Sequence, residues 1–279
     1  MILLDFSNTS SAIMHVQGKD VIDVGLFRHY MINSILSTKA THGKKFGEIV
    51  IAIDGRNYWR KGVFPHYKAH RKAHREKSTI DYDAFYAAVN QVKHELKTVF
   101  PYKVIEVEGA EADDVIGVLA SIAQEPTLIY ANDGDFEQLL RNPACKQYRT
   151  ITKKWIADKP LPEIEWDLFY KICKGDAGDG IPSCINPNDC FVTKTRQKPL
   201  SEKTIRDWYS NGIPPNVSER FFENKRLIDL REVPAEIKES ILAEFSKEPV
   251  GSKGLIYKYL MENDLRQLAQ SLMDDLGRI

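Results

Sequence analysis

Residues 108–140, with the sequence EGAEADDVIGVLASIAQEPTLIYANDGDFEQLL, combine a helical pattern at 112–123 with an apolar run at 127–131. A short apolar run bounded by turn residues is typical of a buried strand. Between Lys103 and Arg141 the chain has no lysine or arginine, but it has nine acids. The segment therefore predicts a helix and a strand, and it carries a high density of negative charge.

Three other apolar runs have the same character, and together the four predict a sheet. The runs are MILL at 1–4, IVIAI at 49–53, YKVIEV at 102–107 and TLIYA at 127–131. Helical patterns lie between them, as at 82–98 and 112–123. Strands that are nearly free of polar residues and alternate with helices are typical of a parallel sheet covered on both faces. We therefore predict an α/β fold with a mainly parallel sheet and flanking helices.

The second part of the chain has a different pattern. From about residue 160 onward no strand-like run remains, and short helical segments such as 201–212 and 235–245 are separated by proline and glycine. We expect an α/β domain at 1–158 and a helical domain at 159–279.

Composition places the chain among soluble globular proteins, with 43% hydrophobic and 28% charged residues. Its N-terminus, MILLDFSNTS, has no basic lead, and the apolar runs are too short to span a bilayer, so the cytoplasm is the expected compartment. No CxxC pair occurs, which predicts reduced, unpaired thiols instead of a zinc site. The four cysteines are Cys145, Cys173, Cys184 and Cys190.

Acidic residues follow each predicted strand. In an open parallel sheet the carboxyl ends of the strands lie along one edge, where ligands bind. The sequence KGDAGDGIP at 174–182 adds two further acids from the helical part. We expect the following carboxylates to meet at this edge: Asp5, Asp54, Glu111, Asp113, Asp114, Asp133, Asp135, Asp176 and Asp179.

Any single acid here also has an ordinary structural explanation, because an acid after a strand commonly caps a helix. A group of acids is different, because like charges about 4 Å apart repel by roughly 4 kcal/mol per pair at an effective dielectric near 20. Oxygen-only ligand sets suit hard cations such as Mg²⁺ or Mn²⁺. The acids therefore predict a divalent-metal site, and two ions would suit phosphodiester hydrolysis.

The basic segment RNYWRKGVFPHYKAHRKAHREK at 56–77 has eight lysines and arginines and one acid. Aromatic residues are interleaved with the cations, at Tyr58, Trp59, Phe64 and Tyr67. A basic run can be a solvated face, but this one leaves the sheet at the edge where metals are expected. Cations neutralise phosphates and aromatic rings stack on unpaired bases, so the segment suits nucleic acid.

Together these motifs resemble those of the 5′-nuclease superfamily, which includes flap endonucleases and phage 5′→3′ exonucleases. The helical part, including NKRLIDLREVPAEI at 224–237, resembles in particular the ribonucleases H of T-even bacteriophages. The matched elements, in the family's order, are LLDFSN at 3–8, AIDGR at 52–56, WRKGVFPHYKAHR at 59–71, EGAEADDVIG at 108–117, ANDGDFEQLL at 131–140 and KGDAGDGIP at 174–182.

The resemblance implies a PIN-like nuclease domain with a basic arch at about 56–80, and a helical DNA-binding domain with a modified helix–turn–helix element. It also implies two Mg²⁺ ions, for which Mn²⁺ can substitute. By the family's pattern the first ion is surrounded by Asp5, Asp54, Glu111, Asp113 and Asp133. The second is surrounded by Asp135, Asp176 and Asp179, with Asp114 in support.

Lys68 and Arg71 match the arch lysine and arginine that contact the scissile phosphate in the family. With these two, the implied catalytic residues are Asp5, Asp54, Asp113, Asp133 and Asp135. The implied nucleic-acid contacts in the arch are Arg56, Arg60, Lys61, Tyr67, Lys68, Arg71, Lys72 and Arg75.

The implied activity is metal-dependent 5′→3′ exonuclease and flap endonuclease cleavage with ribonuclease H activity, removing RNA primers and flaps in phage-type replication. The expected substrates are DNA with 5′ flaps, nicks or ends and RNA–DNA hybrids. We expect a monomer in the host cytoplasm, with a single-stranded-DNA-binding protein as a candidate partner. Sliding-clamp binding is not expected, because the chain begins at its first predicted strand.

The chain departs from the family's pattern after residue 182. Most members continue with a glycine-rich hairpin that binds duplex backbone and a monovalent ion, but this chain reads SCINPNDCFVTKTRQKPLSEKT at 183–204. A potassium site is therefore not expected. Either a solvated loop or substitute phosphate contacts would explain the cations Lys194, Arg196, Lys198 and Lys203.

Two other functions deserve comparison. A haloacid-dehalogenase-type phosphatase would also use Asp5 with magnesium, but it needs a second aspartate where this chain has Ser7. A non-catalytic, structure-selective DNA-binding relative would have lost some of the carboxylates, and every matched position here keeps its acid.

Overall fold

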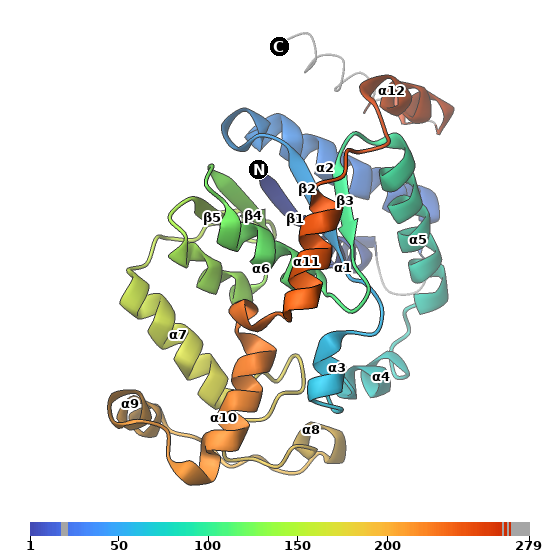
Figure 1. Cartoon of the computed structure of the whole chain (residues 1–279). Helices are drawn as coiled ribbons and strands as arrows, with labels where there is room; N and C mark the ends of the chain where they lie inside the picture. Colours follow the sequence, from blue (N-terminus) through green and yellow to red (C-terminus); the bar gives the residue numbers. More distant parts are fainter. Residues whose placement is uncertain (18–21, 264, 267, 269–279) are drawn as a thin grey trace.

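The computed structural model (Figure 1) describes residues 1–17, 22–263, 265, 266 and 268. A six-stranded sheet in the order β3-β2-β1-β4-β5-β6 forms its centre. The first five strands are parallel and β6 is antiparallel to β5, which confirms the predicted mainly parallel sheet. The strands are β1 (Ile2–Asp5), β2 (Ile49–Ile53), β3 (Lys103–Glu106), β4 (Thr127–Tyr130), β5 (Cys145–Arg149) and β6 (Lys154–Trp155).

Strands β2 to β4 lie within their predicted runs and β1 extends one residue beyond its run, to Asp5, whereas β5 and β6 are not among the predicted runs. In β5 the residues at 146, 148 and 149 are only half-buried, and both residues of β6 are exposed. An apolar run marks a strand that is buried on both faces, so strands toward a partly solvated edge lack that signal.

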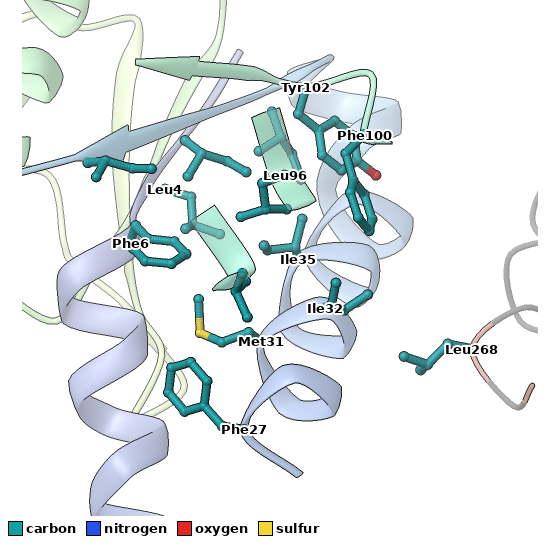
Figure 2. Packing of buried hydrophobic residues seen from close by; sticks show 14 of the residues in the cluster. Leu4, Phe6, Phe27, Met31, Ile32, Ile35, Leu96, Phe100, Tyr102 and Leu268 are labelled. Atoms are coloured by element: carbon teal, nitrogen blue, oxygen red, sulfur yellow. The ribbon is translucent and has the colours of Figure 1, made fainter. Parts of the chain in front are cut away.

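One face of the sheet is covered by α1 (Phe6–Gln17), α2 (Val24–Phe46) and α5 (Tyr82–Val99), as Figure 1 shows. Leu4 from β1 packs there with Ile35 and Leu96 (Figure 2), and the whole cluster is buried. Helix α12 (Lys253–Glu262) from the C-terminal part joins the same cluster.

The other face is covered by α6 (Ala112–Ile122), the 3-10 helix η1 (Gly134–Arg141) and α11 (Ala235–Phe245). Leu3, the neighbour of Leu4, is fully buried on this face. Successive residues of a strand point to opposite faces, so a strand that is apolar throughout needs a helical layer on each side. Each helical layer therefore includes one helix from the C-terminal part of the chain: α12 on the first face and α11 on the second.

The rest of the C-terminal part is helical, as predicted, and surrounds a third buried cluster, which Phe64 and Tyr67 of the arch complete. The arch itself contains two short helices, α3 (Trp59–Val63) and α4 (His70–Arg75). The C-terminal elements are α7 (Leu161–Lys174), α8 (Cys190–Thr193), α9 (Glu202–Asn211), α10 (Pro215–Ile228) and η2 (Leu230–Glu232).

Helix α7 is followed by the loop at 175–189 and the one-turn α8. Gly175 ends α7 with a φ of 73°, and a Cβ there would lie 2.3 Å from the Ile181 carbonyl oxygen. Only glycine tolerates both the left-handed backbone and this close approach. The chain can therefore reverse directly after α7 and present the acids at 176 and 179.

None of the described helices is long and apolar enough to cross a membrane. All four cysteines are buried, and none of them forms a disulfide.

Candidate active site

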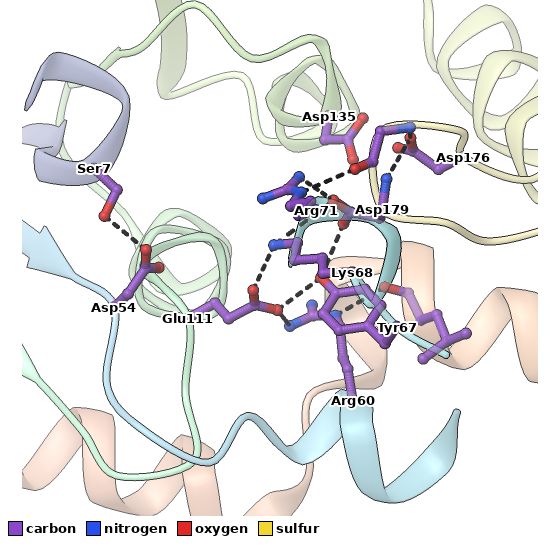
Figure 3. A network of polar contacts seen from close by, with 12 residues as sticks. Ser7, Asp54, Arg60, Tyr67, Lys68, Arg71, Glu111, Asp135, Asp176 and Asp179 are labelled. Atoms are coloured by element: carbon purple, nitrogen blue, oxygen red, sulfur yellow. Dashed lines mark hydrogen bonds and ion pairs between the residues drawn. The ribbon is translucent and has the colours of Figure 1, made fainter. Parts of the chain in front are cut away.

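The acids at the carboxyl edge of the sheet come from the same segments that the sequence indicated. Asp5 is the last residue of β1, and Asp54 follows β2 directly. Glu111 is the N-cap of α6, and Asp133 is the N-cap of η1. Glu111 and Asp133 thus have the ordinary role of helix caps, but the acids still concentrate negative charge at one place, and Figure 3 shows Asp54 and Glu111 among them.

Asp5 has little contact with solvent, since only 5% of its surface is exposed. Burial raises its pKa to about 7, and the nearby charges of Asp54 and Asp133 add to the shift. Asp113 is affected in the same way, because burial and then the charge of Asp5 raise its pKa well above the ordinary value. These carboxylates therefore resist ionisation until a cation is nearby.

Asp54 is oriented by two hydrogen bonds. Its carboxylate accepts from the Ser7 hydroxyl at 2.6 Å and from the backbone N–H of Ala112 at 2.8 Å. The helix α6 and the start of α1 thus both hold this side chain in place. In the sequence, Ser7 was notable only because a phosphatase would need an aspartate at that position. In the structure its hydroxyl donates a hydrogen bond to Asp54.

Four of the acids lack a cationic partner. Within the ranges that the structure describes, none of them forms an ion pair with lysine or arginine. We call Asp5, Asp54, Asp113 and Asp133 the unpaired acids.

Four other acids are each neutralised by a side chain of the arch or of α7, and we call Glu111, Asp135, Asp176 and Asp179 the paired acids. Glu111 is 2% exposed and accepts three hydrogen bonds (Figure 3). The donors are Arg60 Nη1 at 2.9 Å, the Tyr67 hydroxyl at 2.8 Å and Lys68 Nζ at 2.5 Å.

Asp179 ties the arch to the loop after α7. Its carboxylate accepts from Arg71 Nη2 at 2.7 Å and lies 2.9 Å from the Tyr67 hydroxyl, whose one proton it shares with Glu111. Its carbonyl accepts from the Lys68 backbone at 2.8 Å, where Lys68 has a φ of 56°. Burial opposes the charge of the Lys68 ammonium, but Asp179 and Glu111 outweigh it and raise its pKa. The base of the arch is therefore held by charged contacts on both sides.

Asp135 and Asp176 share one partner, Lys171, in the last turn of α7. Lys171 Nζ contacts Asp135 directly and lies 2.7 Å from Asp176 Oδ2. Burial raises the pKa of Asp135 to about 6, with Asp133 adding to the shift and Lys171 opposing it. For Asp176 burial is outweighed by Lys171 and by backbone donors, which lower the pKa. Sequence reasoning missed Lys171, because a lysine near a helix end is common and nothing in the spacing indicates its partners.

Arg60 corrects the expectation of a nucleic-acid contact. Only 3% of its surface is exposed, and its guanidinium lies 2.8 Å from Asp114 and 2.9 Å from Glu111. Asp114, which is fully buried, also accepts from Trp59 Nε1 at 3.1 Å. A guanidinium enclosed in this way cannot reach a phosphate in the same conformation. Arg60 and Asp114 instead hold Glu111 and the start of α6.

The arch aromatics are also less available than expected. Phe64 is 1% exposed and Tyr67 is 2% exposed, and both belong to the cluster with α7 and α10. Tyr58 and Trp59 are half-buried. Burying a ring is favoured over leaving it in water, so the rings anchor the arch instead of standing free for base stacking.

The remaining predicted nucleic-acid contacts are at the surface. In the arch these are Arg56, Lys61, Lys72 and Arg75, and beyond α8 they are Lys194, Arg196, Lys198 and Lys203. The second set lies on or beside a loop that Asn186 closes by donating to the carbonyl of Lys198 at 3.0 Å and accepting from its N–H at 2.7 Å. This closure lies in the segment after residue 182, where the sequence departs from the pattern of the family that it resembles.

The donor set fits a divalent cation, because it consists of oxygens with uncompensated charge. In the described part of the chain, however, no three acidic, histidine or cysteine side chains are arranged to hold an ion as they stand. Lys68 and Lys171 lie among the acids instead. Metal binding would therefore need local side-chain movement.

Comparison with protein families decides the relationship. Residues 11–161 match the model of the 5′–3′ exonuclease N-terminal resolvase-like domain, and residues 162–275 match the C-terminal region of T4 RNase H. The chain belongs to the 5′–3′ exonuclease family. Within this family, it is 31% identical over 287 residues to the ribonuclease H of Enterobacteria phage T4, which covers 97% of this chain and 94% of that protein.

Solved structures of the 5′–3′ exonuclease family have the same fold. The 5′-exonuclease of bacteriophage T5 with bound zinc has a TM-score of 0.61 at 16% identity, covering 98% of both chains. The T5 flap endonuclease in a pseudo-enzyme–product complex with DNA and metal ions has a TM-score of 0.60 at 16% identity, covering 88% of this chain and 99% of that one. The resemblance inferred from the motifs is confirmed.

Proposed function

We propose that this chain is a metal-dependent 5′-nuclease that hydrolyses phosphodiester bonds near the 5′ ends of DNA, or of RNA in RNA–DNA hybrids. Membership of the 5′–3′ exonuclease family supports the nuclease activity. The similarity to a phage ribonuclease H supports a hybrid substrate, and the T5 flap endonuclease that shares this fold was solved with DNA and metal ions.

One observation carries the proposal: the acids that end or follow four strands and those of the loop after α7 meet beside the base of a basic arch. We assign the unpaired acids, with Glu111, to a first Mg²⁺ and assign Asp135, Asp176 and Asp179 to a second, and Mn²⁺ can substitute. Asp114 supports them from its buried contacts with Arg60. Two bound ions would lower the pKa of a water molecule and neutralise the leaving oxygen.

The chain's own side chains would position the substrate. Lys68 and Arg71 stand at the base of the arch beside the acids, where they can stabilise charge that develops on the scissile phosphate. Glu111 and Asp179 orient them, and Arg60 orients Glu111 in turn. The exposed cations of the arch and of the loop at 183–200 would neutralise the phosphates farther along the strand.

We propose further that the enzyme acts as a monomer in the host cytoplasm on 5′ flaps, nicks and RNA primers during phage-type replication. The part up to residue 158 would supply most of the chemistry, and the helical part would add Asp176 and Asp179 and bind duplex DNA. A single-stranded-DNA-binding protein is the partner we would test first, and a sliding clamp is not expected.

Neither alternative has a supporting observation. A phosphatase of the haloacid-dehalogenase type needs an acid at position 7, where the Ser7 hydroxyl donates to Asp54. A non-catalytic DNA-binding relative would not need the unpaired acids, each of which is kept at a cost in electrostatic repulsion.

The test is product analysis on three labelled substrates: a 5′-flap duplex, a nicked duplex and an RNA–DNA hybrid. We expect Mg²⁺-dependent cleavage that proceeds from 5′ ends and leaves a 5′-phosphate and a 3′-hydroxyl. Addition of a chelator should abolish it. Release of mononucleotides from 3′ ends, or cleavage that does not need a divalent ion, would contradict the proposal.

A further inference from the structure

Lys171 occupies a position that neither the motifs nor the family resemblance assigns. It lies one turn before Asp176, at the end of α7, and its ammonium group bridges two acids from different parts of the chain. The side chains of Asp135 and Asp176 are each 20% exposed, and that of Lys171 is 31% exposed. All three are therefore partly shielded from water, where an ion pair is stronger than at an open surface.

We infer that Lys171 is a resident cation of the second metal position, holding the carboxylates of Asp135 and Asp176 close together until a divalent ion takes its place. The inference rests on the proposed function, because it assumes that these acids are metal ligands. An ammonium group and a divalent ion repel each other, so both cannot sit against the same two carboxylates. Binding at this position must then include the departure of Lys171.

The surroundings of Lys171 provide room for that movement. A cavity of about 260 Å³ lies between η1 and α7, and Asp135, Leu168 and Lys171 are among the residues that line it. A lysine side chain has four flexible carbons and can turn into this space without any change in α7.

The unpaired acids provide the contrast that makes the inference testable. Within the described residues no lysine or arginine pairs with them, so an ion held by these four acids breaks no ion pair of theirs. An ion bound by Asp135 and Asp176 must first break two contacts to Lys171. We therefore assign the tighter binding step to the unpaired acids and the weaker step to the second position.

The experiment is a titration of the full-length, metal-free protein with Mn²⁺, in which bound and free ions are counted by electron paramagnetic resonance. In Lys171→Met we expect the weaker binding step to tighten on the order of tenfold and the tighter step to stay unchanged. The melting temperature of the metal-free variant should be lower than that of the wild type, because two acids lose their counter-ion, and Mn²⁺ should restore it.

Lys174→Met is the matched control. Lys174 lies on the same helical turn, but its Nζ donates to the carbonyl of Leu200 at 2.7 Å, and it pairs with no acid among the residues that the structure describes. In Lys174→Met we expect no tightening of the weaker Mn²⁺-binding step and no fall in the metal-free melting temperature of the kind expected for Lys171→Met. Lys171→Arg, which keeps the cation, should leave the weaker step weak. If Lys171→Met does not fold without metal, Lys171→Gln should show the same tightening.

Equal affinities of the weaker step in the wild type, Lys171→Met and Lys171→Gln would overturn the inference and leave the proposed function standing. Absence of Mn²⁺ binding in every variant would overturn both. The readout is independent of cleavage, so a variant that loses activity for another reason does not confuse the two outcomes.

Discussion

The unpaired and the paired acids lie side by side at one edge of the sheet, yet they differ in what balances their charge. Asp5 and Asp113 have raised pKa values because burial and neighbouring carboxylates act on them without a cationic partner. Asp176 is also largely shielded, but its pKa is lowered because Lys171 and backbone donors outweigh burial. Burial alone therefore does not decide the state of a carboxylate in this site.

The difference indicates how the site is prepared for its ligands. Charge that is left unbalanced attracts a cation from solution, whereas charge that is already balanced must exchange one cation for another. Lys68 and Arg71, which balance two of the paired acids, are also the side chains expected to contact phosphate. Binding of metal and substrate should then be coupled through exchange of partners at Glu111 and Asp179.

The largest expected effect is a fall in the cleavage rate when one unpaired acid or one paired acid is replaced by its neutral amide. Asp5→Asn and Asp135→Asn should each lower the cleavage rate on the order of a thousandfold, because a metal ligand is lost. Affinity for flap DNA should persist in both. The metal-free proteins should differ between the groups, however: Asp5→Asn should melt at a higher temperature than the wild type, and Asp176→Asn, which removes a carboxylate with a lowered pKa, should not. Equal shifts in the melting temperatures of the metal-free variants would contradict the distinction between the unpaired and the paired acids.

Arg60→Met tests whether the paired acids depend on buried cations. Removing one partner of a buried ion pair typically costs about 3–5 kcal/mol, because the other charge is left buried. We expect a loss of that size in the free energy of unfolding, measured by urea denaturation. Arg56→Met, at an exposed arch position, is the control and should change stability little. A small effect of Arg60→Met would show that Glu111 and Asp114 find other partners.

Lys68→Ala separates docking from chemistry at the arch. The single-turnover cleavage rate at saturating flap DNA should fall on the order of a hundredfold, as expected for one lost donor to the transition state. Lys77→Ala should chiefly weaken binding, and less so as the salt concentration rises. If Lys68→Ala loses affinity alone and cleaves normally at saturation, Lys68 is a docking residue.

The smallest expected effect is on thermal stability as a function of pH without metal. The pKa of Asp5 is raised from 3.8 to about 7, so its contribution to stability is present below its unfolded pKa and is lost as pH rises through about 7. In a chelator the melting temperature should therefore fall by a few degrees between about pH 6 and about pH 8. Stabilisation by Mg²⁺ should be greater at the higher pH. A melting temperature that does not change with pH in the chelator would show that ionising the unpaired acids does not destabilise the fold.

Several properties of this protein follow from the sequence alone. Four apolar runs identify the strands β1 to β4, and acids directly after them must lie at one edge because parallel strands share the direction of their carboxyl ends. Family motifs supply the order of the acids and the position of the arch. These are local patterns, so a linear chain is enough to read them.

The partners of each charge could be seen only in the tertiary structure. Tyr67 and Glu111 are 44 residues apart, Arg71 and Asp179 are 108 apart, and Lys171 and Asp135 are 36 apart. No spacing rule connects such pairs, and an arginine in a basic run looks the same whether it faces solvent or a buried acid. Which cations reach DNA and which hold the acids is decided by burial and by proximity across the fold, because both depend on how distant segments pack.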